Sequence, residues 1–212
     1  MRNYLYFICV LLLLAAGAGC GGGQIKPEPV TLDKPLPEYE QPKTELTPEQ
    51  QYIARVLTKK GYDYNHDKPT VIMVHKLSRK LVFYRGLTPL KTYPVVLGND
   101  PYNDKLCQGD ACTPEGVYRV RAKYPHPKWD CFIWLDYPNT QNWLKFAKAK
   151  EAGRIPPEAD IGGQVGIHGT PDPYRNILGE NWTKGCISLR NKDLDEIYPL
   201  VNDKTLVIIT KQ

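Results

Sequence analysis

The stretch NWTKGCISLRN runs from Asn181 to Asn191 and places Cys186 directly after Gly185. The residues from Cys186 to Leu189 alternate between apolar and polar types, which predicts a short strand. A glycine lets the backbone approach a substrate closely, and the N–H groups around Cys186 can face an oxyanion that forms after attack. A cysteine nucleophile also needs a base that forms its thiolate near neutral pH. The stretch therefore indicates a nucleophile, if a histidine lies beside it in the fold.

One histidine of the four in the chain has a suitable setting. His168 leaves a short predicted strand over residues 164–168 and enters the turn Gly169-Thr170-Pro171. A side chain at this point is held firmly and stays reachable. Taken alone, His168 is more simply a packed histidine, but with Gly185-Cys186 downstream we predict that it is the base. The other three histidines lie in a polar loop, at the end of a strand and between two prolines (His66, His75 and His126).

Short β-rich segments dominate the chain from residue 69 onward. They are bounded by glycine, proline and asparagine, and two or three helices accompany them, so we predict one domain that is mainly β with a few helices, as a sandwich or open barrel. A helix over 193–201 has Asn191 as its cap, and Lys145, Lys148 and Lys150 read as a solvated helix face. The remaining predicted strands cover residues 70–75, 80–84, 92–97, 116–121, 131–135 and 206–210.

The first part of the chain reads as an export signal. MRNYLYFICVLLLLAAGAGC has Arg2 near its start, an apolar centre too short for a comfortable membrane span, and small residues before Cys20. The ending resembles a bacterial lipobox, although Gly17 stands where a leucine-like residue is usual. We therefore expect a signal peptide over 1–19, secretion across the inner membrane and lipidation of Cys20, with an ordinary signal peptide cut elsewhere as the alternative.

A proline-rich segment follows the signal. Residues 20–46 hold few apolar side chains and many prolines, so we expect a tether that keeps the domain away from the membrane. Residues 47–68 form a helix and a linker, with Thr47 and Gln50 as a capping box and Gly61 near the end. Residues 69–212 then make up the domain, which we expect to be periplasmic or to face the cell wall.

The charge pattern argues against a nucleic-acid partner and is compatible with an anionic polymer. The net charge of +5 is modest and dispersed, and no basic stripe interleaved with aromatic residues predicts nucleic-acid binding. A mildly basic surface suits an anionic polymer such as the cell wall.

Six cysteines raise the question of disulfides. Cys9 leaves with the signal peptide, and an oxidising compartment favours pairing among the cysteines of the domain. Cys107 and Cys112 flank Gln-Gly-Asp-Ala, so we expect a local disulfide between them and a free thiol at Cys131. The alternative pairs Cys131 with Cys186 and removes the nucleophile. A metal site is not expected, because the histidines and cysteines lack paired ligand spacing.

These motifs together carry a family resemblance. IHGT (167–170) followed by WTKGCISLRN (182–191) resembles the signature of the L,D-transpeptidase (YkuD) catalytic domain. TPEGVYRV (113–120), KTYPVVLG (91–98) and DKTLVIIT (203–210) resemble further strands of that family, in the same order. The resemblance covers about residues 70–212. It implies a β-sandwich-like fold, peptidoglycan stem peptides as substrate, and chemistry without a metal or cofactor.

The resemblance also implies roles for single residues. Cys186 is the nucleophile and His168 its base, oriented by a backbone carbonyl. Thr183 lies where the family has serine or threonine beside the site, and Gly185 and Cys186 hold the place of the backbone oxyanion donors. Gly169 and Trp182 flank the pair as candidate substrate contacts.

Many family members have an arginine two residues after the cysteine, where it can meet a substrate carboxylate. This chain has Ser188 there, and Arg190 falls on the same face of an extended segment, so both are candidate substrate-binding residues. Gly109-Asp110, Thr113-Pro-Glu-Gly and Asp136-Tyr-Pro-Asn, with Trp182 before the site, resemble the YafK-type branch, whose implied activity includes cleaving a lipoprotein from peptidoglycan.

Three functions of different kinds follow. We favour a cysteine acyltransferase or hydrolase that attacks the carbonyl at the L-centre of meso-diaminopimelate, with hydrolysis preferred to 3-3 cross-linking or protein attachment. A papain-like peptidase is disfavoured, because that class places cysteine before histidine in the chain. A non-catalytic lipoprotein that binds peptidoglycan and tethers the envelope fits the tether and the charge equally well, and only the intact Cys–His motif speaks against it.

Overall fold

The computed structural model describes residues 45–212. The predicted signal peptide, the lipidation of Cys20 and nearly all of the tether lie outside this range. The described elements are α1 (Pro48–Lys59), β1 (Thr70–His75), β2 (Lys80–Arg85), β3 (Thr88–Pro94), β4 (Gly116–His126), β5 (Asp130–Leu135), α2 (Thr140–Glu151), β6 (Gly166–His168), α3 (Pro173–Leu178), β7 (Ile187–Ser188), α4 (Asn191–Ile197), the 3-10 helix η1 (Tyr198–Leu200) and β8 (Leu206–Thr210).

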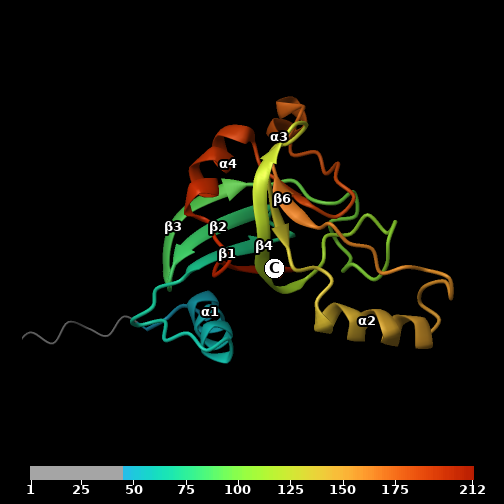
Figure 1. Ribbon diagram of the computed structural model, residues 1–212, viewed down its shortest axis with the longest axis horizontal. Helices are drawn as coiled ribbons and strands as arrows, with labels where there is room; N and C mark the ends of the chain where they lie inside the picture. The colour runs from blue at the N-terminus through green and yellow to red at the C-terminus, as the bar shows by residue number, and fades with distance from the viewer. Residues whose placement is uncertain (1–44) are drawn as a thin grey trace, which may run out of the picture. The chain divides into compact units, whose positions relative to one another are not determined.

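All eight strands join one curled sheet in the order β3-β2-β1-β8-β4-β5-β6-β7 (Figure 1). The pairs β1–β8 and β6–β7 are parallel and the others antiparallel. The long strand β4 pairs with β8 through its first residues and with β5 from Val120 onward, with a register shift between Val120 and Ala122. Such irregularities bend a strand, and here the bend turns β5, β6 and β7 away from the direction of β1 and β2. The predicted mainly β fold with a few helices is confirmed.

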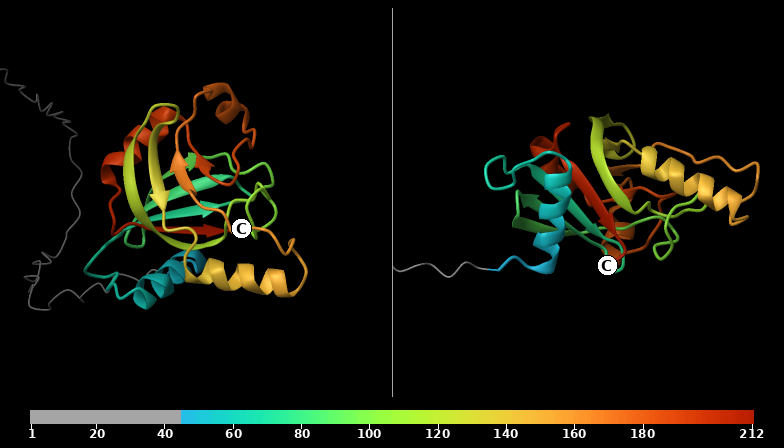
Figure 2. Two further views of the ribbon diagram at one scale, coloured as in Figure 1. Left: turned by 45° about the vertical axis from the view of Figure 1, so that its right-hand side comes forward. Right: turned by 90° about the horizontal axis from the view of Figure 1, so that it is seen from below.

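Both faces of the central strands are buried, which explains their nearly continuous apolar sequences. Ile72 and Val74 of β1 point into the main core, whereas Val71 and Met73 point to the opposite face. The helix α1 covers that opposite face through Ile53, Ala54 and Leu57. Figure 2 shows α1 packed across this layer.

The capping box predicted at the start of α1 is confirmed. Thr47 Oγ1 accepts from Gln50 N at 3.2 Å, and Gln50 Oε1 accepts from Thr47 N at 2.9 Å. Two N–H groups that have no partner within the helix are thereby satisfied. Gln50 also donates to the Leu87 carbonyl at 3.1 Å, which joins the start of α1 to the turn before β3.

Several predicted boundaries differ from the structure, among them those of one strand and one helix near the site. The strand predicted over 92–97 ends at Pro94, and the chain continues through single bridges of Val96 to Ser188 and Gly98 to Thr183. In the predicted helix over 193–201, Arg190 rather than Asn191 is the N-cap, and the α-helix ends at Ile197 before a 3-10 turn that contains Pro199. Proline ends the α-helix because it lacks the N–H donor. Among residues 45–212 the helices are all too short or too polar to cross a membrane.

We predict that α1 is an integral part of the folded domain. Leu57 is fully buried against the sheet, so Leu57→Ala should lower the free energy of unfolding by about 2–5 kcal/mol through lost burial and a residual cavity. Thr58→Ala, on the exposed side of the same helix, should change it by less than about 0.5 kcal/mol. Urea unfolding followed by circular dichroism measures both. Equal, small effects would show that α1 does not contribute to stability.

Candidate active site

The parallel pair β6–β7 brings His168 and Cys186 together. Ile167 pairs with Ile187 and His168 with Ser188, so Cys186 stands level with Gly166 at the entry to β7. Alternate residues of a strand share a face. Cys186 and His168 therefore lie on the same face as diagonal neighbours, on adjacent strands joined by a loop that contains α3. The structure thus brings together the two residues predicted to be nucleophile and base.

His168 is held in one orientation. Its side chain is 1% exposed and its Nδ1 lies 2.6 Å from the Gly169 carbonyl oxygen. Its ring stacks on Trp129 at 4.6 Å between centroids and meets the Trp182 ring edge-on at 5.6 Å. A carbonyl oxygen only accepts hydrogen bonds, so Nδ1 carries the proton and Nε2 is left as the basic nitrogen.

Burial decides the charge of His168. It lowers the pKa of the imidazole to about 4, although the Gly169 carbonyl opposes the shift. The ring is therefore neutral at neutral pH, as a general base must be before it accepts a proton.

The thiol of Cys186 is also neutral at rest. Sγ lies 3.6 Å from the carbonyl oxygen of Gln164, a residue with a φ of 56° in the left-handed region. Burial raises the pKa of the Cys186 thiol to about 11, while the backbone of Gly166 and the charge of Lys105 act in the opposite direction. A thiol beside a neutral imidazole, rather than a preformed ion pair, is the resting arrangement.

The turn before Cys186 is closed by Thr183. Its hydroxyl donates to the Cys186 carbonyl at 2.7 Å and accepts from Gly185 N at 3.1 Å. The Gly185 N–H is therefore engaged, and the expectation that it serves as an oxyanion donor is wrong for this arrangement. The N–H of Cys186 makes no hydrogen bond within residues 45–212 and remains available for that role.

Gly185 is required for a different reason than the one expected. Its φ is +135°, and a Cβ there would lie 2.7 Å from the Cys112 carbonyl oxygen. The glycine thus allows the turn to pack against the loop that carries Cys112.

Ser188 is not a surface contact for substrate. It is fully buried, and its Oγ donates to the Gly169 carbonyl at 3.0 Å and accepts from Asn176 Nδ2 at 3.0 Å. Asn176 Oδ1 in turn accepts from Trp182 Nε1 at 2.9 Å. Ser188 therefore holds the carbonyl that orients His168, and the expectation of a direct substrate role is corrected.

Arg190 is likewise committed elsewhere. Its Nε and Nη2 lie 2.5 and 3.0 Å from the two carboxylate oxygens of Asp193 in the first turn of α4. The strand ends at Ser188, so Arg190 does not continue an extended face as expected. This bidentate pair engages two of the five N–H donors of the guanidinium and directs the group towards Asp193, so it is less available to a substrate carboxylate.

Gly169 and Trp182 do line the site. Gly169 N donates to the Trp129 carbonyl at 3.0 Å, and a Cβ on Gly169 would lie 2.5 Å from Asn191 Oδ1. Trp182 touches His168 by its ring and carries the Arg175 guanidinium 5.4 Å above its centre. Gly169 supplies the carbonyl that bonds His168 and Trp182 contacts the His168 ring, and substrate binding by either residue remains a prediction.

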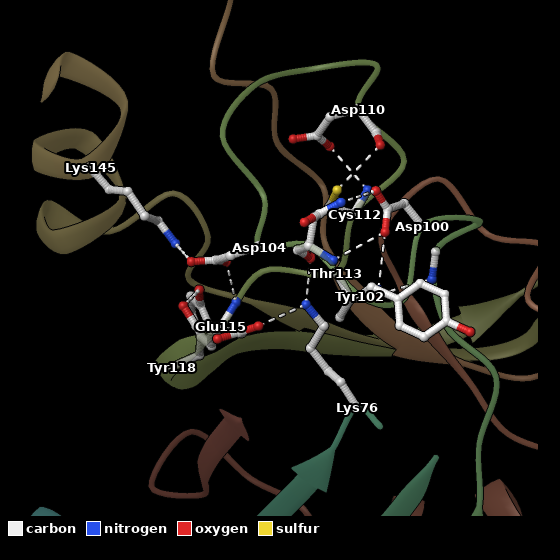
Figure 3. A network of polar contacts seen from close by, with 12 residues as sticks. Lys76, Asp100, Tyr102, Asp104, Asp110, Cys112, Thr113, Glu115, Tyr118 and Lys145 are labelled. Carbon is white, nitrogen blue, oxygen red and sulfur yellow. Dashed lines mark hydrogen bonds and ion pairs between the residues drawn. The ribbon is translucent and has the colours of Figure 1, made fainter. Parts of the chain in front are cut away.

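The predicted disulfide between Cys107 and Cys112 is absent, since both are free thiols in the structure, as are Cys131 and Cys186. The Asp110 carboxylate closes this loop instead, and Figure 3 shows Asp110 beside Cys112. It accepts from the backbone N–H groups of Leu106, Cys107 and Cys112 at 2.7, 3.0 and 3.0 Å. Burial opposes ionisation, but the Lys105 ammonium and these N–H groups outweigh it and hold the pKa of Asp110 below its ordinary value.

Sequence reasoning missed the residues that support the pair. Trp129, Asn176 and Lys105 reach the site from three different loops or helices, and no local pattern marks any of them. Asn176 lies in α3, a short helix that the pattern of apolar residues in the sequence did not predict. Within residues 45–212 the histidine, cysteine and acidic side chains form no cluster of three or more that could hold a metal ion.

The sequence profile of the L,D-transpeptidase catalytic domain (YkuD) matches residues 69–209. The chain belongs to this family. A protein from Bacillus licheniformis, assigned by name to the L,D-transpeptidases as YkuD, is 28% identical over 142 residues, which are 67% of this chain and 66% of that protein. The L,D-transpeptidase signature residues thus fall within the matched range.

Solved structures share the fold. The helical cell shape determining protein Pgp2 from Campylobacter jejuni superposes with a TM-score of 0.51 at 19% identity, over 77% of this chain and 55% of that one. A point mutant of Pgp2 gives the same TM-score at 20% identity, over 78% and 57% of the two chains. The chain thus spans about half to two thirds of the length of these relatives.

The buried neutral His168 predicts a loss of stability in mild acid. The unfolded chain takes up a proton near pKa 6.5, whereas folded His168 does so only near 4. The stabilising contribution is complete above the unfolded pKa and is lost as pH falls towards the folded one. Lowering the pH from about 7.5 to about 5 should cost about 2 kcal/mol through this residue. Urea unfolding at both pH values should show a smaller loss for His168→Gln; an unchanged loss would contradict the assignment.

The buried serine predicts a second effect on stability. Ser188→Ala removes one donor from the Gly169 carbonyl and leaves Asn176 Nδ2 without its acceptor, which should lower the free energy of unfolding by about 1–3 kcal/mol. Ser78→Ala, at an exposed turn position, is the matched control and should stay within about 0.5 kcal/mol of wild type. If thermal denaturation gave the two variants the same midpoint, the network around Gly169 would have no energetic weight.

Proposed function

We propose that this chain is a peptidoglycan-modifying cysteine acyltransferase or hydrolase that acts on the carbonyl at the L-centre of meso-diaminopimelate in stem peptides. The observation that carries the proposal is the diagonal placement of Cys186 and His168 on β6 and β7, within the domain shared with the L,D-transpeptidases. A neutral imidazole with a free Nε2 beside a neutral thiol is suited to general-base attack on a carbonyl.

The acylation step uses the groups already described. The Cys186 thiol transfers its proton to His168 Nε2 as Sγ attacks the carbonyl carbon, and the oxyanion faces the free N–H of Cys186. The C–N bond then breaks, the imidazolium returns the proton to the departing amine, and a thioester remains on Sγ. The amine is the terminal D-alanine or a linked amine.

In the second step we expect water rather than an amine to resolve the thioester, and Ser188 and Arg190 support this preference. An arginine two residues after the cysteine would hold a substrate carboxylate, but the chain has Ser188, and Arg190 is paired with Asp193. Without a free guanidinium, a second stem peptide is retained less well as acceptor. Water, activated by neutral His168 Nε2, then resolves the thioester, whereas 3-3 cross-linking or protein attachment is the alternative outcome.

The cellular setting extends the same proposal. The predicted signal peptide and lipidated Cys20 would anchor the domain to a membrane on the wall side, within reach of stem peptides and of a lipoprotein linked to peptidoglycan. The polymer is anionic and the chain carries a net charge of +5.

The thiol itself provides the first test. Cys186→Ser should lower activity on purified muropeptides by several orders of magnitude, because a neutral hydroxyl beside one histidine is a far poorer nucleophile. Circular dichroism should show an unchanged fold, since the change is nearly isosteric. Cys131→Ser is the matched control and should keep activity. Full activity of Cys186→Ser would show that another residue is the nucleophile, whereas an inactive wild-type protein would favour the non-catalytic tether.

The fate of the acyl group is tested with two substrates in parallel. Purified enzyme is incubated with disaccharide-tetrapeptides and with lipoprotein-linked muropeptides, and the products are analysed by mass spectrometry. We expect release of D-alanine or of the lipoprotein remnant, with few dimers. Abundant cross-linked dimers from the tetrapeptides, with the linked muropeptide untouched, would reverse the preference for water and leave the roles of Cys186 and His168 standing.

A further inference from the structure

A buried cation lies beside the nucleophile turn. The Lys105 side chain is 4% exposed, and its Nζ lies 3.8 Å from the point that a Cβ on Gly185 would occupy. It comes from the loop between β3 and β4, far from Cys186 in the sequence. The carbonyl oxygen of Cys112, from the same loop, comes within 2.7 Å of that point. The loop therefore delivers a positive charge to the residue that precedes the thiol.

The ammonium group is fixed in place with one donor to spare. Lys105 Nζ donates to Asp110 Oδ1 at 2.7 Å and to the Cys107 carbonyl at 3.0 Å. An ammonium has three N–H donors, so within the described residues one remains uncommitted. Taking such a charge out of water is costly unless its partners are well placed. A buried charge with a free donor beside Gly185, one residue from the nucleophile, is therefore in position to act on negative charge that forms at Cys186.

Loop closure alone does not account for Lys105. Asp110 already accepts three backbone N–H groups, from Leu106, Cys107 and Cys112, and these bonds hold the loop without the lysine. The charge of Lys105 also favours the thiolate form of Cys186. Both His168 and Cys186 are neutral at rest, so attack separates charge inside a site where burial makes each charge costly.

We propose that Lys105 acts on Cys186 electrostatically: its ammonium stabilises the negative charge that develops on Cys186 as the thiol proton moves to His168. The inference rests on the proposed function only in taking Cys186 as the nucleophile. Asp110 has two opposed effects in this arrangement. It holds the ammonium in place, and its own charge weakens the field that the ammonium exerts at Cys186.

The test measures the thiol directly rather than peptidoglycan turnover. Cys186 is alkylated with iodoacetamide across a pH series, and peptide mass mapping gives a rate for each cysteine. Lys105→Met keeps the aliphatic stem and removes the charge, so the rate of Cys186 alkylation between about pH 7 and 9 should fall about tenfold, which corresponds to about one pH unit in the pKa of the thiol. Lys105→Arg should restore most of the rate. The exposed Lys184→Met is the matched control, and screening by water should limit its effect to about twofold.

Asp110→Asn distinguishes the charge from a merely structural role. It leaves Lys105 charged and removes the opposing carboxylate, so Cys186 alkylation should become faster, whereas general loosening of the loop predicts the same direction of change in both variants. Cys131, which lies on β5 rather than in this loop, should react at the wild-type rate throughout. An unchanged rate of Cys186 alkylation in folded Lys105→Met would overturn the proposal, as would slower alkylation in Asp110→Asn if Lys105→Met fails to fold. If muropeptide activity were lost while Cys186 alkylation stayed at the wild-type rate, the proposal for Lys105 would be overturned independently of the proposed function.

Discussion

The carbonyl oxygen of Gly169 accepts two hydrogen bonds, from Nδ1 of His168 at 2.6 Å and from Oγ of Ser188 at 3.0 Å. The first fixes which nitrogen of the imidazole is basic. The second fixes the carbonyl itself to the strand that carries the nucleophile. Because Ser188 pairs with His168 across β6 and β7, the base and its orienting group are both tied to the segment that carries the nucleophile. The rest of the site is arranged to keep these groups buried and in register.

Burial has opposite effects on the two reacting groups. It lowers the pKa of His168 to about 4 and raises that of Cys186 to about 11. Each shift disfavours a charged form, so both groups are stored neutral and charge appears only during attack. A site of this kind depends on fixed polar groups that stabilise the charge as it forms. The free N–H of Cys186 and the buried ammonium of Lys105 are the two described groups in such a position.

Two peripheral parts of the chain support this arrangement. The loop held by Asp110 packs its carbonyl groups against Gly98 and Gly185, where any Cβ would collide. On the other side, α3 sends Asn176 inward to join Ser188 and Trp182. The curl of β4 makes both contacts possible, because it turns β5, β6 and β7 out of the plane of the central strands (Figure 1). The geometry of the site therefore depends on the packing of these two segments as well as on the local motifs that carry Cys186 and His168.

The sequence by itself determined the mainly β class, the helix α1 with its capping box and the pairing of Cys186 with His168. These follow from periodicity, from cap residues and from a motif whose members lie close together in the chain. Only the tertiary structure decided what Ser188, Arg190, Gly185 and the loop cysteines do. Ser188 is buried and bonds the Gly169 carbonyl, and Arg190 pairs with Asp193. Asp110 closes the loop for which a disulfide was expected. The physical reason is that a polar side chain is committed by whichever partner the fold brings near it, and those partners are separated from it in sequence or hidden by burial.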